Sequence, residues 1–240
     1  ATQRFDEPVT ATISVTNTGS TPTGESFRVA YDARGTPYQN DTQVTMAGNV
    51  TVSKSLAAGE TVDKTVSFTS WVQDNRVTGD VRLDAVADPD NNVSEARSTD
   101  NDASSRFAVT YADLTTAVSE PPVATAGTNA TVRTYVRNNG TANGSTTDVS
   151  VTLTDSDGTT VQSDTVAVGE VTPDGRNRTE IAPTLAPGEY TVTATVADAT
   201  FPEGNTSAAT FTVDEYNLTA GTTSTPTELE VGQNSTVAFT

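Results

Sequence analysis

The chain of 240 residues carries 31 Asp and Glu against 13 Lys and Arg, a formal net charge of −18, and it contains neither histidine nor cysteine. The missing residues exclude disulfides, thiolate metal sites and nucleophiles activated by histidine. The acidic balance also argues against nucleic acid as a partner, because phosphate binding requires a basic face.

The charge pattern indicates a protein made for high salt. The basic residues include two lysines, Lys54 and Lys64, and the other eleven are arginines. In dilute salt such a surface repels itself and destabilises the compact state. In molar salt the Debye length falls to about 3 Å and the repulsion largely vanishes. The composition therefore fits a halophilic archaeon, and an ordinary acidic surface protein is the alternative.

The first hundred residues predict short β-strands separated by turns. Apolar residues alternate with polar ones over 9–15, 27–31 and 62–68, which places one face of each segment in a core. The first of these segments ends at the turn Asn17-Thr18-Gly19. Trp71 is expected to end the last of them as a core plug or a lid on one end of the sandwich.

The stretch 81–107 predicts a strand, an acidic loop and a second strand. Val81, Leu83 and Ala85 alternate with polar residues, and the alternation resumes at Phe107. Between them lie several acidic residues, a proline and asparagines, a composition that favours turns and cannot fill a core.

The pattern then repeats after about a hundred residues. Phe107 matches Phe211 and Leu114 matches Leu218 at the same offset, and Asn138-Asn139-Gly140 is the counterpart of the earlier turn. Tyr190, just after a glycine turn at the head of a strand, resembles the tyrosine corner of Ig-like sandwiches.

These observations predict an all-β fold of tandem antiparallel Ig-like β-sandwiches, with about seven strands each and essentially no helix. The expected domains are residues 1–111, with the first strand missing, residues 112–215, and residues 216–240. The last segment is either the start of a third repeat, in a window cut from a longer chain, or a strand donated to the first domain of a neighbouring chain.

Five segments carry a family resemblance: ADLTTAV (112–118), RNNGT (137–141), LAAGET (56–61), LAPGEY (185–190) and VADPDNNVSEARSTDND (86–102). Together they resemble CARDB, the cell-adhesion-related Ig-like repeat of haloarchaeal and bacterial surface proteins. Glu95, Asp100 and Asn101 stand where the acidic pattern of the family would put them, and the second repeat keeps Glu203 and Asn205. The resemblance implies a β-sandwich at a cell surface, without enzymatic activity.

The acidic loop offers weak candidates for a structural Ca²⁺ site, although we commit to no metal or other cofactor. The oxygen-bearing candidates are Asp88, Asp90, Asn92, Asp100 and Asp102. Val93 and Thr99 occupy the positions where an EF-hand loop needs Gly and Glu. The alternative is a solvated turn.

Ten Asn-x-Ser/Thr sequons predict N-glycosylation, mostly in turns and at strand ends. They lie at Asn40, Asn49, Asn92, Asn129, Asn139, Asn143, Asn177, Asn205, Asn217 and Asn234. The alternative is that a threonine-rich chain forms such sequons by chance.

We therefore expect a non-enzymatic extracellular protein, a repeat module of a cell-surface stalk, sheath or filament. Its expected partners are copies of itself or neighbouring repeats, and other surface proteins or glycans. The alternative is an adhesin or a viral spike that recognises a glycan or a partner cell. Exposed aromatic residues would mark that alternative, and the candidates are Trp71, Tyr38 and Tyr216.

Overall fold

The computed structural model describes residues 1–119, 124–197 and 201–215, and the regular secondary structure of the described chain is almost entirely β-strand. The chain divides into two compact units. Unit 1 contains Ala1–Leu114, Arg137–Ser145 and Glu170–Gly175, and unit 2 contains the described residues of Thr115–Val136 and Thr146–Gly169 and those from Arg176 onward. The predicted segment 216–240 lies outside the described residues.

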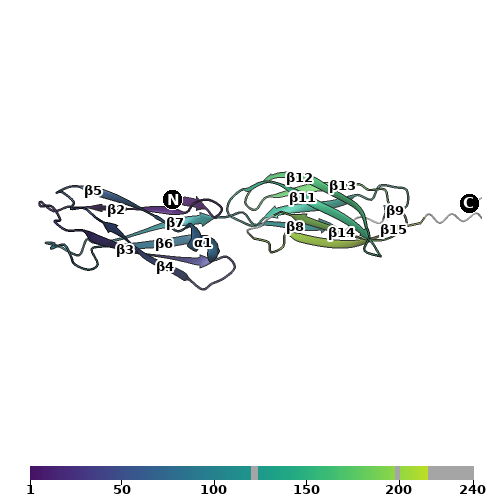
Figure 1. The fold of residues 1–240 in the computed structure, drawn as a ribbon. Coiled ribbons are helices and arrows are strands. Elements are labelled where there is room, and N and C mark those ends of the chain that lie inside the picture. Colours follow the sequence, from purple (N-terminus) through teal and green to yellow (C-terminus); the bar gives the residue numbers. More distant parts are fainter. Residues whose placement is uncertain (120–123, 198–200, 216–240) are drawn as a thin grey trace, which may run out of the picture. The chain divides into compact units, whose positions relative to one another are not determined.

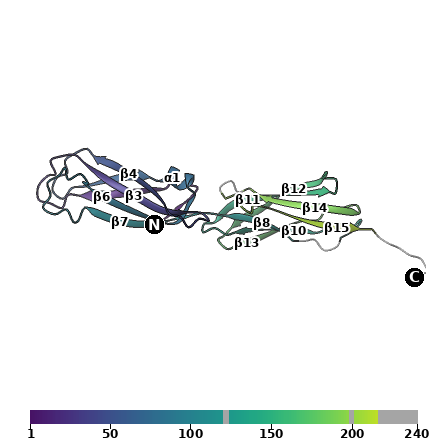
Figure 2. The ribbon, with the colours of Figure 1, turned by 90° about the horizontal axis from the view of Figure 1, so that it is seen from below.

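The first sandwich consists of two sheets formed by seven strands. The strands are β1 (Thr2–Arg4), β2 (Thr10–Thr16), β3 (Phe27–Pro37), β4 (Val44–Val52), β5 (Thr61–Ser67), β6 (Val77–Ala87) and β7 (Asp102–Thr110). One sheet has the order β1-β7-β6-β3-β4, and the other contains β2 and β5 (Figures 1 and 2). All pairs are antiparallel except the short parallel pair of β1 and β7.

The core of this sandwich follows the predicted alternation of apolar residues. Val81, Leu83 and Ala85 of β6 are all buried, as the sequence pattern requires. Phe68 is fully buried, and its ring centroid lies 5.9 Å from that of Tyr31 and 6.1 Å from that of Phe107. The aromatic rings therefore join the two sheets.

Trp71 does not end a strand but lies in a helix of six residues, α1 (Thr69–Asp74). The strand ladder ends at Phe68, whose N–H donates to the carbonyl of Val9 at 2.8 Å. The chain then turns, because the N–H of Val72 donates to the carbonyl of Phe68 at 2.8 Å. Val72 fills the core, and Trp71 is half-buried against the Phe68 ring at a centroid distance of 6.5 Å.

Among its described residues, the second sandwich contains eight strands, again in two sheets. They are β8 (Leu114–Ser119), β9 (Ala124–Thr125), β10 (Val132–Asn138), β11 (Gly144–Asp155), β12 (Thr160–Val171), β13 (Arg176–Ile181), β14 (Gly188–Val196) and β15 (Thr206–Asp214). The sheet orders are β13-β10-β8 and β12-β11-β14-β15-β9. The tandem Ig-like fold predicted from the sequence is thus confirmed.

The tyrosine corner is present in the second sandwich. Tyr190 is buried at the start of β14, and its hydroxyl donates to the carbonyl of Ala186 at 3.0 Å, four residues earlier in the chain. The Tyr190 ring stacks on Phe211, the neighbour in register on β15, with centroids 5.8 Å apart. This arrangement fixes the turn that leads into the strand.

Candidate functional site

The acidic loop is closed by Asp88, the first of the calcium candidates. Its side chain is buried, and its φ of 45° lies in the left-handed region, which aspartate tolerates better than most residues. Its two carboxylate oxygens accept from the N–H groups of Asn92, at 2.9 Å, and Val93, at 2.8 Å. Asp88 therefore holds its own loop together through main-chain atoms.

Asp90 forms a bidentate ion pair with Arg28 of β3. Nε of Arg28 donates to Oδ2 of Asp90, and Nη2 donates to Oδ1, both at 2.6 Å. This hydrogen bonding lowers the pKa of Asp90 below its ordinary value. The N–H of Asp88 also donates to the carbonyl of Arg28 at 2.8 Å, so the loop is tied to β3 at two points.

The remaining loop candidates point to solvent. Asn92 and Asp100 are exposed, and Asp102 is exposed at the first position of β7. Glu95 and Asn101, which match the family pattern, bind each other through Nδ2 and Oε2 at 2.7 Å. Among the described residues, no group of three or more acidic side chains is arranged to hold a metal ion. The calcium site therefore stays a prediction.

Eight of the ten sequon asparagines lie in the described residues, and they differ in exposure. Those that are exposed are Asn40, Asn49, Asn92, Asn129, Asn139 and Asn143. Asn177 and Asn205 are half-buried, and Nδ2 of Asn177 donates to the carbonyl of Val168 at 3.0 Å. Asn217 and Asn234 lie outside the described residues. Transfer of a glycan needs an accessible amide nitrogen, so Asn177, half-buried and bonded through its Nδ2, is a poor acceptor.

The two Asn-x-Gly turns have the same hydrogen bonds in both repeats. The Asn17 amide donates to the carbonyls of Thr21, at 2.8 Å, and Leu56, at 2.9 Å, while its Oδ1 accepts from the Gly19 N–H at 3.0 Å. Asn138 makes the matching three bonds, to the carbonyls of Ala142, at 2.8 Å, and Val171, at 2.9 Å, and from the Gly140 N–H, at 2.9 Å. The sequence located these turns, but it did not show that one asparagine organises each of them.

The second turn also binds the segment before β8, residues 111–113. The carbonyl of Tyr111 accepts from the N–H groups of Thr141 and Ala142, both at 2.7 Å, and the carbonyl of Asp113 accepts from that of Asn139 at 2.8 Å. The Asp113 N–H in turn donates to Oδ1 of Asn138 at 3.1 Å. These contacts lie within unit 1, and they fix the start of β8. Sequence reasoning missed them because residues 111–113 have no turn signature of their own.

Asp113 also receives a side-chain bond from Tyr38, which was considered from the sequence only as an exposed aromatic. Asp113 is buried, and the Tyr38 hydroxyl donates to its Oδ2 at 2.8 Å. The Arg76 guanidinium lies over the Tyr38 ring, 5.0 Å from its centroid. Burial, and then the bond to Asp113, raise the pKa of Tyr38. Tyr38 is thus a structural residue of unit 1.

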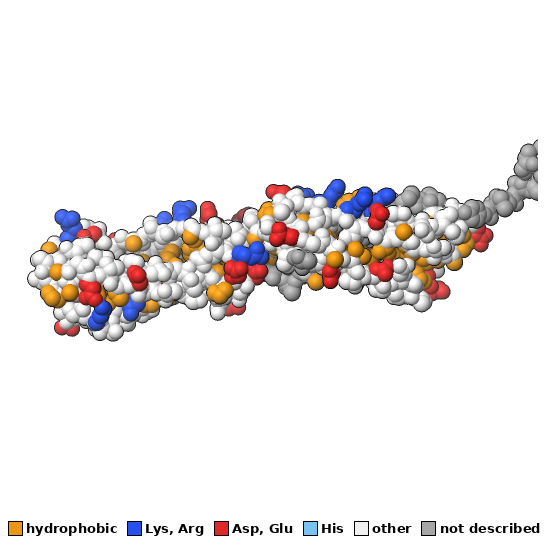
Figure 3. Space-filling model, turned by 90° about the horizontal axis from the view of Figure 1, so that it is seen from above, with side chains coloured by type: hydrophobic (Ala, Val, Ile, Leu, Met, Phe, Trp, Pro, Cys, Tyr) orange, Lys and Arg blue, Asp and Glu red, His pale blue; other side chains and the backbone are white. Residues whose placement is uncertain are grey.

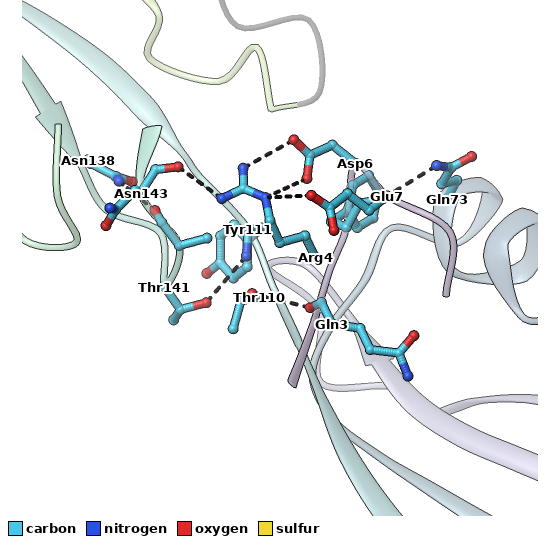
Figure 4. Close-up of polar contacts among 12 residues, drawn as sticks. Gln3, Arg4, Asp6, Glu7, Gln73, Thr110, Tyr111, Asn138, Thr141 and Asn143 are labelled. Atoms are coloured by element: carbon cyan, nitrogen blue, oxygen red, sulfur yellow. Dashed lines mark hydrogen bonds and ion pairs between the residues drawn. The ribbon is translucent and has the colours of Figure 1, made fainter. Parts of the chain in front are cut away.

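A third polar cluster surrounds Arg4 on β1 (Figure 4). Its guanidinium donates to both carboxylate oxygens of Asp6, at 3.0 and 3.1 Å, and to the carbonyl of Asn143 at 3.3 Å. The bond to Asp6 raises the pKa of Arg4, and the same bond lowers the pKa of Asp6. Nδ2 of Asn143 donates to Oε1 of Glu170 at 3.0 Å. All these residues belong to unit 1.

The polar residues of the described chain form no recognisable catalytic arrangement. Without histidine or cysteine, a lysine base would have to use Lys54 or Lys64. Lys54 is bound by the carboxylate of Glu60. The pKa of Glu60 is lowered, chiefly by that bond.

None of the helices among the described residues is long and apolar enough to cross a membrane.

Comparisons with known proteins concern curated proteins, solved structures and family models. No curated protein is similar enough to the chain to count as a match. Among solved structures, the CARDB domain of the PF1109 protein from Pyrococcus furiosus, in complex with di-metal ions, is 28% identical with a TM-score of 0.34, over 43% of this chain and 93% of that one. A domain named as part of a cell-surface protein of Methanosarcina acetivorans is 23% identical with a TM-score of 0.33, over 42% and 91%.

A transglutaminase of red sea bream is 11% identical with a TM-score of 0.37, over 88% of this chain, and the chain spans only 30% of that enzyme. With TM-scores this low, the structural alignments add nothing to the assignment. The decisive comparison is with a family model, CARDB, which matches residues 3–105 and again residues 111–225. CARDB is a family of non-catalytic surface domains. The two matches cover most of the sequence, and the chain belongs to the CARDB family, of which it contains two tandem repeats.

Proposed function

We propose that this chain is a non-enzymatic structural module of an extracellular surface, a repeat of a glycosylated stalk, sheath or filament in a halophilic archaeon. One observation carries the proposal. Several polar side chains that a binding or catalytic site could use are instead bonded to the protein's own main chain. Asp88 closes its loop, while Asn17 and Asn138 hold their turns. Such a chain is suited to keeping its shape and to giving length by repetition.

The surface supports the extracellular part of the proposal. Acidic side chains lie scattered over both sandwiches in the view of Figure 3. Six sequon asparagines are exposed, so glycans attached to them would reach solvent without unfolding a strand.

The alternative, an adhesin or a spike, receives no specific support from the described residues. The large apolar side chain that they expose is Val161, at 45%, and it is not aromatic. Trp71 packs on Phe68, and Tyr38 binds Asp113. Tyr216, the third candidate, lies outside the described residues.

The test is secretion of the chain from a halophilic archaeal host, followed by glycopeptide mapping and intact-mass measurement. We expect glycans at exposed sites, so Asn40→Gln should remove one glycan mass. Asn177→Gln is the matched control, and it should leave the mass of the glycans unchanged because the Asn177 amide is half-buried and bonded to Val168. An intact mass equal to that of the bare chain would refute the glycan part of the proposal.

A further inference from the structure

Among the described residues, the first sandwich has an uncovered sheet edge at β2, whereas the equivalent strand of the second sandwich has a neighbour on both sides. In the described part of the chain, strand β2 pairs with β5 on one side only (Figure 1), whereas its counterpart β10 lies between β13 and β8 in the strand order of its sheet. The correspondence is set by the turns that follow the two strands, at Asn17 and at Asn138. Among the described residues, the outer edge of β2 carries no third strand.

The hydrogen bonds show which main-chain groups face this edge. The Val9 carbonyl accepts from the Phe68 N–H, and the Asn17 N–H donates to the Glu60 carbonyl, so the odd-numbered residues of β2 face β5. The main-chain N–H and C=O groups of Thr12, Ser14 and Thr16 therefore face outward, and no described residue bonds to these main-chain groups. At the end of the strand, Gln3 binds the N–H of Thr10 at 2.8 Å and its carbonyl at 2.7 Å.

The turn after β2 likewise has no segment bonded to its outer N–H groups among the described residues. In the second repeat the N–H groups of Asn139, Thr141 and Ala142 donate to the carbonyls of residues 111–113. The matching positions in the first repeat are Thr18, Ser20 and Thr21, whose residues have no such segment beside them in the described chain.

The inward-facing side chains of β2 are more exposed than those of β10, as expected for a strand that lacks a neighbour on one side. Val132 and Val136 of β10 are 0% and 1% exposed. Their counterparts on β2, Ala11 and Val15, are only half-buried, although they too point into the sandwich. A strand added beside β2 would cover them.

We propose that the open edge, defined as the outer edge of β2 from Thr12 to Thr16 together with the turn 17–21, binds residues 216–222 of a second copy of this chain. The occupant follows from the sequence: YNLTAGT at 216–222 matches ADLTTAV at 112–118, the segment that runs into and forms β8 in the second repeat. Asn217 then takes the place of Asp113, and Leu218 takes that of the buried Leu114. The bonds are main-chain bonds of the kind seen in strand addition.

This contact deepens the proposed function, because it would join the modules of a stalk or filament head to tail. It rests on the proposed function in one respect, namely that the chain associates with copies of itself. It also places Asn217 against the turn of another copy. We therefore expect the sequon at Asn217 to carry no glycan in the assembled form.

Cysteine pairing tests the contact, because the chain has no cysteine of its own. Thr18 corresponds to Asn139, whose N–H bonds the carbonyl of Asp113, so Thr18→Cys protein mixed with Asn217→Cys protein should form mixed disulfide dimers under mild oxidation in high salt. Thr65→Cys is the control, since Thr65 is an exposed residue on β5, away from the open edge. Mixed dimers should exceed those of the control at least tenfold. Equal yields would overturn the proposal, and a double Thr18→Cys/Asn217→Cys variant that closed only within one chain would exclude a second copy as the occupant.

A matched pair of proline variants provides an independent measurement. Thr12 and Thr65 are exposed partners in register on β2 and β5, and the N–H of each points away from the other strand. Thr12→Pro removes a donor from the open edge, whereas Thr65→Pro removes one from the far side of the same sheet. Sedimentation analysis should show self-association of the full chain weakened at least tenfold by Thr12→Pro and little changed by Thr65→Pro. Equal effects, or full association after deletion of residues 216–240, would refute the contact. Both measurements use purified protein, so their failure would leave the surface location and the glycans untouched.

Discussion

At the scale of single residues, two asparagines organise the turns on which the fold and the candidate site depend. Asn17 and Asn138 make the same three bonds, yet their surroundings differ: Asn17 is half-buried, and Asn138 is fully buried and also accepts from Asp113. An asparagine can satisfy a main-chain donor and two carbonyls at once, which neither Asp nor Ser can do. Among the described residues, the two sites therefore differ in that the segment 111–113 binds the turn at Asn138 and no such segment binds the turn at Asn17.

We expect Asn138→Ala to destabilise the protein more than Asn17→Ala. The first removes four hydrogen bonds from a buried position, and we estimate its cost at about 3 kcal/mol or more, against about 1–2 kcal/mol for the second. Chemical denaturation in high salt, followed by circular dichroism and by the fluorescence of Trp71, measures both. A smaller loss for Asn138→Ala would contradict this account of the turns.

At the scale of elements, the acidic loop between β6 and β7 is a connector tied to its own sheet. Asp88 bonds the loop internally, and Asp90 binds the neighbouring strand through Arg28. The guanidinium of Arg28 thus partly neutralises the negative charge of this loop. The oxygens that would be the first ligands of Ca²⁺ are already hydrogen-bonded, so a metal would have to compete for them.

Calcium should therefore leave the stability of the chain unchanged. We expect no shift in melting temperature between 10 mM EDTA and 10 mM CaCl₂ in 2 M KCl, because Asp88 and Asp90 are occupied by Asn92, Val93 and Arg28. These concentrations are about those that would saturate a weak extracellular site. Asp88→Ala should lower stability by about 1–3 kcal/mol, with or without Ca²⁺, because two main-chain donors lose their acceptor. A saturable rise in melting temperature that Asp88→Ala abolished would establish the calcium site instead.

At the scale of the whole molecule, the balance of charge governs stability. A net charge of −18 on 240 residues raises the energy of the folded chain in dilute salt. The ion pairs with lowered carboxyl pKa values, such as those of Asp6 and Asp90, offset only part of it. Screening by salt removes the repulsion between charges that are about a Debye length or more apart.

The melting temperature should accordingly rise with KCl, most steeply from about 0.05 M to about 1 M, where the Debye length falls from over 10 Å to about 3 Å. Each kcal/mol added to the free energy of unfolding corresponds to a rise in melting temperature of about 2–4 °C for a chain of this size. Sucrose at equal osmolality is the control, because it stabilises folded proteins without screening charge. A melting temperature independent of KCl in that range would contradict the proposed adaptation to high salt.

The sequence by itself determined the class of fold, the family and the turns. Alternating apolar residues such as Val81, Leu83 and Ala85 report which face of a strand is buried, because side chains alternate along a strand whatever its neighbours are. Asn-x-Gly and Gly-Glu-Tyr signals likewise act within a few residues. Trp71 was the exception: its position in a helix depends on where the ladder between Phe68 and Val9 ends, which is a contact between distant segments.

Only the tertiary structure decided which strands are neighbours and which edges are covered. Asp113 and Asn138 are 25 residues apart, and Arg28 and Asp90 are 62 apart, so no local pattern pairs them. The sequence predicted that the first domain lacks its first strand, but it did not show that the uncovered edge belongs to β2, because the residues of β2 alternate just as those of β10 do. The hydrogen bonds between strands are made by main-chain N–H and C=O groups, which nearly every residue carries. The residue types of a strand therefore do not show which strand lies beside it.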